Sequence, residues 1–386
     1  MHLIKTSRGA SWAVRQMREL VKCNVEVHVV LPSYSGNASD YTAAGVKVHI
    51  LDMDLSLKSA VNLPFQIQQF QKLLQKIRPD LVHSHFFSTT LLMRLAMRNH
   101  SIPKIFQVPG PLHLEHAFFR TMELMPADKN DYWVASCEWT KKKYQSLLVD
   151  KTKVFLSYYG TDVDNFTKGD KAYLYNELGI CKKTKLIGLV AYMYPPKPYL
   201  GQKRGLKGHE DLIDAVAILL NQKYDVALVV VGGAWAGAVA YEKAVIAYGR
   251  QKLGDRVFFL GTRRDVTRLY SSFDMAVHPS HSENVGGAVE SLLMKIPTIT
   301  TDIGGFPDVI KHKQTGLLAK AANPHDLAQH MMFYLENPGL AEKHCLKGYD
   351  HTRQLFDVKR TADEIRKIYA KILLDTKSFY RSSQIN

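Results

Sequence analysis

The residues of this chain that are best placed to do chemistry lie between Ser282 and Pro297. A predicted strand, Met275–Val277, is followed by a turn and then by a helix that we expect to begin at Gly286-Gly287. Glycines at a helix start leave backbone N–H groups open to an approaching anion, which the helix dipole also favours. The segment therefore predicts an anion-binding helix start, and an ordinary glycine-rich helix cap is the alternative.

Two glutamates flank this predicted helix start. Glu290 falls about one turn inside the helix, where a carboxylate can accept hydrogen bonds from both hydroxyls of a ribose. Glu283 lies just before the helix, where it could hold the hydroxyls of a sugar. A carboxylate beside a phosphate repels it, and sugar hydroxyls would give both glutamates a reason to be there. The alternative is a pair of solvated glutamates.

A loop rich in cations follows the predicted strand that ends at Ala191. Lys207-Gly208 stands at the start of the next predicted helix, where a lysine can reach a diphosphate leaving group as a positive charge. The same loop carries three more cations, Lys197, Lys203 and Arg204. A proline-rich surface loop with ordinary lysines is the alternative, and only the neighbouring glycine–glutamate segment favours the functional interpretation.

Two other loops in the second half of the chain also follow predicted strands. The loop after Val257–Leu260 contains Arg263 and Arg264, around which backbone groups could hold the edge of a nucleobase. A plain strand-to-helix turn explains that loop equally well. Gly304-Gly305 follow Thr298–Thr300 and permit either close approach of the backbone to a ligand or a sharp turn.

The first half of the chain offers weaker signals. Gly9 lies in a loop that follows the first predicted strand and opens a helix, as phosphate-binding loops do. His113 follows the predicted strand Ile105–Val108, so we expect its side chain to face a cleft. A lone histidine is more often structural than functional, and the same holds for His83 and His85.

Short β-branched runs alternate with longer amphipathic stretches along the whole chain, which predicts parallel sheets with helices on both faces. The alternation restarts after Gly160–Lys171, a segment rich in turn formers. We therefore expect an α/β fold of two Rossmann-like doubly wound domains that face each other across a cleft. The predicted domains are residues 1–165 and 166–360, and the apolar spacing of residues 361–386 predicts a helix that packs back on the first domain.

Lysine and arginine outnumber aspartate and glutamate by 51 to 36, a net charge of +15. An excess of positive charge is informative about the partners of a protein and not about its fold. A solvated basic face, an anionic membrane surface and a phosphorylated substrate each explain it. No aromatic RNA-binding motif, zinc-finger spacing or low-complexity basic arm accompanies it, so we expect no nucleic-acid partner.

The cysteines indicate a reducing compartment. All four are isolated, without a CxxC pair or a histidine at metal-ligand spacing, so we expect neither disulfides nor a metal site. No run approaches the roughly 18–20 apolar residues of a membrane span, and the N-terminus lacks the apolar core of a secretory signal. The expected location is the cytoplasm, with peripheral attachment to the cytoplasmic face of a membrane as an extension of it.

Several reaction classes find no support in the sequence. It contains no GxSxG motif, no Walker lysine motif and no HExxH motif, and no GxGxxG opens the first strand–helix unit. Nothing local supports a cysteine nucleophile. A serine hydrolase, a P-loop nucleotidase, a zinc protease and a nicotinamide-dependent dehydrogenase are therefore disfavoured.

Taken together, these segments resemble glycosyltransferase family 4, whose members are retaining enzymes of the GT-B fold. The likeness covers nearly the whole chain and is strongest from Lys207 to Gly316. The segments that carry it, by their order and spacing, are Pro79–His85, Gly160–Phe166, Lys207–Glu210, Phe259–Gly261, Ser282–Pro297, Gly304–Ile310 and Thr315-Gly316.

The resemblance implies a nucleotide sugar, UDP- or GDP-linked, in the C-terminal domain and an acceptor on the N-terminal one. It implies that Glu290 binds the ribose, Glu283 the donor sugar and Lys207 the diphosphate, and that His113 faces the donor sugar near the reacting carbon. The catalytic residues implied are thus His113, Glu283 and Lys207. The donor-binding residues implied are Glu290, Gly286, Gly287, Lys203, Arg204, Arg263 and Gly9.

The resemblance further implies transfer of a hexose-type sugar, with retention by front-face attack, to a hydroxyl of a glycan or lipid-linked glycan. No metal and no cofactor beyond the nucleotide sugar are expected, because cations and helix N-termini neutralise the leaving nucleotide. The setting implied is cell-surface polysaccharide or glycolipid synthesis. Another GT-B activity, such as a sugar-nucleotide epimerase, and a nucleotide-binding module without catalysis are the rival hypotheses.

The chain departs from the family pattern at three places, one of which is Asp308, where the family more usually has glutamate. The other two concern the spacing of the glutamates and a missing arginine. Between its two glutamates the family usually has one residue more than the six that separate Glu283 from Glu290. Either the turn is tighter here, or Ser282 takes the first position. Tyr192 stands near the place of the family's arginine, so Lys197, Lys203 or Arg204 would have to replace its charge.

Overall fold

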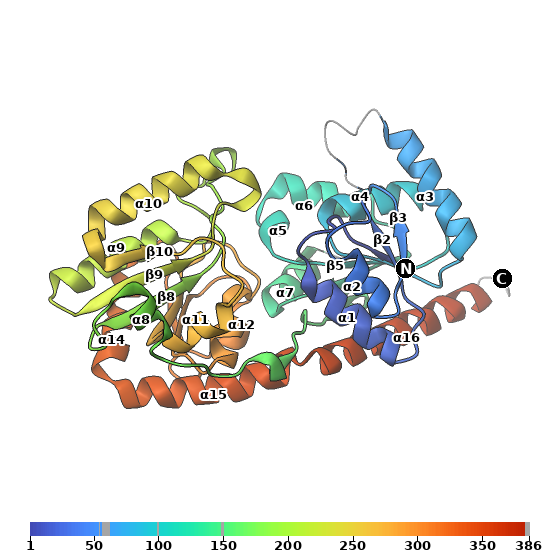
Figure 1. Cartoon of the computed structure of the whole chain (residues 1–386). Helices are drawn as coiled ribbons and strands as arrows, with labels where there is room; N and C mark the ends of the chain where they lie inside the picture. The colour runs from blue at the N-terminus through green and yellow to red at the C-terminus, as the bar shows by residue number, and fades with distance from the viewer. Residues whose placement is uncertain (54, 56–61, 99, 148–149, 383–386) are drawn as a thin grey trace. The chain divides into compact units, whose positions relative to one another are not determined.

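The computed structural model describes residues 1–53, 55, 62–98, 100–147 and 150–382, which form two compact units (Figure 1). One unit consists of Met1–Asp162 together with the chain from Leu355 onward, and the other of Val163–Gln354. The sequence places the first boundary at residue 165, within the short 3-10 helix η3 (Val163–Asn165). The first unit is therefore built from two distant stretches of the chain.

The first unit contains a parallel sheet of seven strands in the order β3-β2-β1-β4-β5-β6-β7. Its strands are β1 (His2–Leu3), β2 (His28–Leu31), β3 (Lys47–Ile50), β4 (Val82–Ser84), β5 (Lys104–Gln107), β6 (Asp131–Ala135) and β7 (Val154–Leu156). Its helices are α1 (Ser11–Lys22), α2 (Ala38–Ala43), α3 (Leu63–Ile77), α4 (Phe87–Ala96), α5 (Leu112–Glu115), α6 (Ala117–Leu124), α7 (Glu138–Leu147) and α16 (Val358–Ser382).

Helix α16 completes the core of this unit. Its apolar residues recur at helical spacing, and Ile365, Ile368 and Ile372 are buried in the same cluster as Met17 and Leu20 of α1. The two helices lie side by side (Figure 1). Burial of a side chain of this size stabilises a fold by about 1.5–3 kcal/mol, so α16 is an integral part of the first unit.

The second unit contains a parallel sheet of six strands in the order β10-β9-β8-β11-β12-β13. Its strands are β8 (Lys185–Val190), β9 (Val226–Val231), β10 (Val257–Phe259), β11 (Met275–His278), β12 (Thr298–Thr301) and β13 (Leu317–Ala319). Its helices are α8 (Tyr173–Leu178), α9 (His209–Asn221), α10 (Val239–Leu253), α11 (Val266–Ser272), α12 (Gly286–Leu293), α13 (Phe306–Val309), α14 (Pro324–Glu336) and α15 (Pro338–Phe356), the last of which runs into the first unit.

The strands predicted at Ile105–Val108, Val257–Leu260, Met275–Val277 and Thr298–Thr300 are present as β5, β10, β11 and β12, with ends shifted by at most one residue. Strand β9 is buried along its whole length, as its unbroken apolar run requires for a strand covered on both faces. The short edge strands β7 and β13 were not predicted from the sequence. Helix α12 begins at Gly286, so the predicted helix start is confirmed.

No helix among the described residues is both long and apolar enough to cross a membrane. The most apolar segments of the chain are instead the buried strands of the two sheets. This is the arrangement expected when parallel strands are covered by helices on both faces.

Candidate functional site

A cavity of about 320 Å³ opens at the carboxyl ends of the strands in the second unit. It lies where the strand order reverses, since β8 has β9 on one side and β11 on the other. Ligands of open parallel sheets bind at such a switch point. The residues that line it and could act on a ligand are Tyr192, Lys207, Arg263, Glu283, Gly287 and Glu290.

Lys207 and Glu283 meet in this cavity as an ion pair. Their side chains are only 16% and 13% exposed, and the Lys207 ammonium also lies 5.5 Å from the centre of the Tyr194 ring. A pair this well shielded from water is stronger than one on the surface. The cavity therefore holds one fixed cation beside one fixed carboxylate.

Two loops bring this ion pair together. The His281 N–H donates to the Leu206 carbonyl at 2.8 Å, which joins the loop after β11 to the loop before α9. At Gly208, where φ is +68°, an added Cβ would lie 2.0 Å from the Pro279 carbonyl oxygen. Only glycine permits this close passage.

The start of α12 forms one wall of the cavity. Gly286 has a φ of +38°, and an added Cβ there would lie 2.8 Å from the Glu283 carboxylate. At Gly287 it would lie 2.7 Å from the His278 ring. Both glycines therefore allow a close approach to a side chain of the site.

Glu290 lies in the first turns of α12, is partly exposed and lines the cavity. Glu283 lines it too, whereas Ser282 is buried and does not. The sequence left open whether Glu283 or Ser282 corresponds to the first glutamate of the family pattern. The lining of the cavity favours Glu283, and with it the tighter turn. The two glutamates and Lys207 are thus brought together in one cavity.

His278, the last residue of β11, also lines the cavity. Its Nε2 atom is 3.2 Å from the Ser291 hydroxyl, and its side chain is buried. Burial, and then the charge of Lys207, lowers the pKa of His278 to about 3. The ring is therefore neutral near pH 7 and adds no charge to the site.

An aromatic group at the cavity was missed by sequence reasoning. The Trp235 ring lies 4.9 Å from Tyr194 and 5.4 Å from Tyr192, between ring centres. Tyr192 and Tyr194 both line the cavity, and the intervening Met193 is buried. The sequence does carry a signal for this pair: Tyr192 and Tyr194 are two residues apart just after a strand, and alternate residues of an extended segment share a face.

The remaining cations predicted for the site lie in different surroundings. Arg263 lines the cavity, but its guanidinium donates to Asp265 at 2.7 Å and to Glu177 at 2.6 Å. Arg204 pairs with Asp211 at 2.5 Å and with Asp214 at 2.7 Å. Lys203 is exposed and lines, with Arg204, a separate hollow of about 530 Å³.

Gly9 and His113 belong to the first unit. Gly9 has a φ of +74° in the loop between β1 and α1, and a Cβ added there would meet no atom within 4 Å. His113 is half-buried in α5, where its Nε2 atom is 3.1 Å from the Tyr144 hydroxyl. Burial lowers the pKa of His113 to about 4, so the ring is neutral near pH 7.

Models of known protein families match both halves of the chain. Residues 9–165 match the model of Glycosyltransferase Family 4, and residues 198–349 match that of Glycosyl transferases group 1. The second match contains Lys207, Arg263, Glu283 and the start of α12, which line the cavity.

Two curated relatives are both D-inositol 3-phosphate glycosyltransferases. That of Actinosynnema mirum is 23% identical over 397 residues, which cover 93% of this chain and 91% of the relative. That of Mycobacterium sp. (strain KMS) is 26% identical over 265 residues, which cover 64% of this chain and 57% of the relative. The chain thus spans little more than half the length of the mycobacterial protein.

A solved structure of similar fold is Anabaena Alr3699/HepE in complex with UDP and glucose. It superposes with a TM-score of 0.79 over 96% of this chain and 98% of that protein, at 19% sequence identity. At this identity the likeness speaks for the fold. Together with the two parallel sheets, it confirms the expected Rossmann-like domains of GT-B type.

Proposed function

This chain belongs to glycosyltransferase family 4, and from that premise we propose that it transfers a hexose from a UDP- or GDP-linked donor to a hydroxyl of a glycan or lipid-linked glycan. The proposal includes retention of configuration and independence of metal ions. The observation that carries it is the cavity in which Lys207, Glu283 and Glu290 meet at the glycine-rich start of α12.

Each of these groups has a distinct task in the proposed reaction. Lys207 and the open N–H groups at Gly286-Gly287 neutralise the diphosphate as it leaves. Glu290 accepts hydrogen bonds from the ribose hydroxyls, and Glu283 from hydroxyls of the donor sugar. A carboxylate is tolerated beside the diphosphate because Lys207 is paired with it.

A transition state with positive charge on the sugar and negative charge on the leaving diphosphate would match this arrangement of charges. Groups that are fixed in place before the reaction need no reorganisation during it. The relatives support the class of donor, since the solved structure of Alr3699/HepE contains UDP. His113 enters the proposal through the family resemblance, as a group that acts near the reacting carbon.

Replacement of Glu290 by alanine tests this assignment. We expect UDP or GDP, whichever the wild-type protein binds, to bind at least about 10-fold more weakly, because the ribose loses hydrogen bonds to a charged acceptor. Calorimetry over a panel of nucleotides and sugar nucleotides, with assay of nucleotide release, measures it. Glu342→Ala, at an exposed position on α15, is the matched control.

Unchanged nucleotide affinity in Glu290→Ala would refute the role of this residue. Tight binding of a sugar nucleotide without release of the nucleotide, with or without acceptors, would favour a binding module. The anomeric configuration of the product, read by NMR, tests retention separately.

A further inference from the structure

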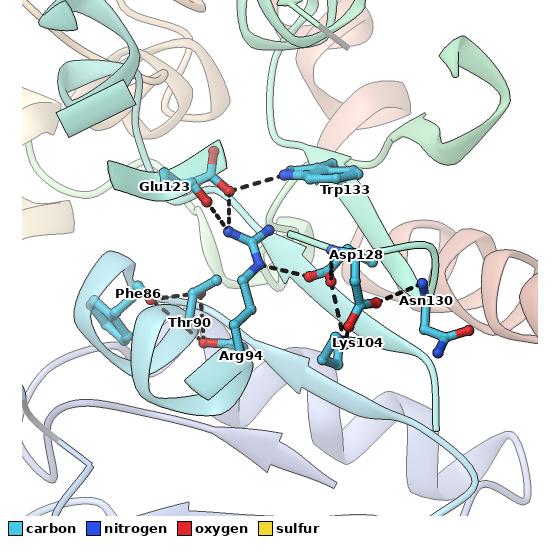
Figure 2. Close-up of polar contacts among 10 residues, drawn as sticks. Phe86, Thr90, Arg94, Lys104, Glu123, Asp128, Asn130 and Trp133 are labelled. Carbon is cyan, nitrogen blue, oxygen red and sulfur yellow. Dashed lines mark hydrogen bonds and ion pairs between the residues drawn. The ribbon is translucent and has the colours of Figure 1, made fainter. Parts of the chain in front are cut away.

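A network of buried charges lies in the first unit. Arg94 of α4 donates to the Glu123 carboxylate of α6 at 2.7 Å (Figure 2). It also donates to the Asp131 carboxylate of β6 at 2.6 Å. All three side chains are at most 1% exposed. Lys104 of β5 joins the network through Asp128 and Asp131. Such a network needs its hydrogen bonds satisfied, since an unpaired buried charge is costly.

Two atoms of this network, Arg94 Nη2 and Glu123 Oε2, are buried without a hydrogen-bond partner among the described residues. The Glu123 Oε1 atom accepts from Arg94 at 2.7 Å and from the Trp133 Nε1 at 3.0 Å (Figure 2). The Glu123 Oε2 atom is buried and accepts no hydrogen bond among the described residues. A carboxylate oxygen in this position calls for an explanation.

The neighbour that explains it is Tyr144 of α7. Burial, and then the nearby Glu123 carboxylate, raises the pKa of Tyr144 well above 10, so the phenol keeps its proton. The Tyr144 hydroxyl lies 3.1 Å from the Nε2 atom of His113. The same hydroxyl therefore contacts the ring of His113 and interacts with the carboxylate of Glu123.

We propose that Tyr144 and Glu123 are positioning residues for His113, with the Tyr144 hydroxyl as a two-position donor. When His113 is neutral, the hydroxyl donates to Nε2 and fixes the ring. When Nε2 takes up a proton from solvent, the hydroxyl rotates and donates to the Glu123 Oε2 atom, while the new N–H donates to the phenol oxygen. The tyrosine keeps its own proton throughout, so the charge on Glu123 stabilises the imidazolium without proton exchange.

The surroundings of His113 agree with this arrangement. Its ring packs against Phe87 and Phe106, with ring centres 5.9 and 5.6 Å away. The charged groups that act on it in the described chain are Glu123, which raises its pKa, and Arg94, which lowers it, while burial lowers the pKa most. The Tyr144 hydroxyl and the Glu123 carboxylate, here called the relay, offer the His113 ring a hydrogen-bonding partner in each protonation state. The proposal rests on the proposed function, which gives His113 its part in the reaction.

NMR titration of His113 in Tyr144→Phe is the first test, and it needs no ligand. Loss of the hydroxyl should lower the pKa of His113 by at least about half a unit, because the imidazolium loses its link to Glu123. Tyr41→Phe is the matched control, since Tyr41 is also buried in the first unit and its hydroxyl has no partner among the described residues. An unchanged pKa of His113 in Tyr144→Phe would overturn the proposal.

Release of UDP from UDP-glucose, followed with pH, is the second test. Tyr144→Phe should lower kcat about 5- to 10-fold, the factor expected for one lost hydrogen bond, with KM changed less than twofold. Glu123→Gln keeps the shape but removes the charge, and should also lower the pKa of His113. Equal effects of Tyr144→Phe and Tyr41→Phe would reduce Tyr144 to a packing role. Full activity of His113→Ala would instead refute the part of His113 in the proposed function, while the titration still decides on the relay.

Discussion

Lys207 is the residue on which the charge balance of the cavity depends. Its ammonium is mostly shielded from water and paired with Glu283, so both charges are held in place. Arg263, the other cation that lines the cavity, is held by two carboxylates of its own. Lys207 shares its charge with one carboxylate and Arg263 with two, so in the proposed function we expect Lys207 and the start of α12 to supply most of the charge for a diphosphate.

Replacement of Lys207 by methionine should weaken binding of UDP or GDP by about 10- to 100-fold. The nucleotide loses a hydrogen bond to a charged donor, which contributes about 1.5–3 kcal/mol, and then faces an unpaired Glu283. Titration calorimetry measures the loss, and Lys243→Met, at an exposed position of α10, is the control. Equal affinities of the two variants would remove Lys207 from the site.

At the scale of elements, strands β1 and β4 place three histidines side by side in the core of the first unit. His2, His83 and His85 are at most 2% exposed. The His2 Nδ1 lies 2.9 Å from the His85 Nε2, and the His83 Nδ1 lies 2.5 Å from the Tyr369 hydroxyl of α16. Their rings are stacked or tilted by no more than 31°, and one ring nitrogen of each lies within 4.8 Å of a ring nitrogen of the other two.

Acid should destabilise the first unit through these histidines. Burial lowers the pKa of His85 to about 3 and the pKa values of His2 and His83 well below 6.5. The folded state therefore keeps the rings neutral, whereas the unfolded chain binds protons below about pH 6.5. The stability gained by neutral rings is complete above about pH 6.5 and is lost as the pH falls towards 3, by up to about 1.4 kcal/mol per pH unit and histidine.

The melting temperature, measured by calorimetry between pH 7.5 and 4, checks this expectation. A variant with one fewer titrating ring, His85→Gln, should show a shallower decline than the wild type, even if it starts from a lower value. A melting temperature that stays constant from pH 6.5 to 4.5 would contradict the expected uptake of protons.

The sequence predicted those elements whose pattern is local. The buried strand β9 and the glycine start of α12 follow from runs of a few residues. Strands β7 and β13 were missed because three residues at a sheet edge carry little pattern. Within the site, the short spacing between Glu283 and Glu290 was enough to predict that the two carboxylates lie in one place. The pairing of Arg204 with Asp211 and Asp214, and the meeting of Tyr144 with Glu123, depend on tertiary packing and left no local signal.

At the scale of the whole molecule, the net charge of +15 bears on where the protein works. An enzyme that extends a lipid-linked acceptor acts at an anionic membrane face, where each nearby lysine or arginine contributes about 1 kcal/mol. We therefore expect binding to vesicles that contain phosphatidylserine and none to vesicles of phosphatidylcholine alone. Sedimentation at low salt measures it, and about 0.5 M salt should abolish it by screening. Equal sedimentation with both vesicle types would contradict an electrostatic attraction.

The return of α16 to the first unit sets the order in which the chain can mature during synthesis. Val163–Gln354 is contiguous, so its sheet can close once its last helix has left the ribosome. The first unit is made earlier but lacks Ile365, Ile368 and Ile372 until the final helix is made. Until then, the apolar face of α1 that these residues cover stays exposed to solvent or to a chaperone. The unit that is translated first is therefore completed last.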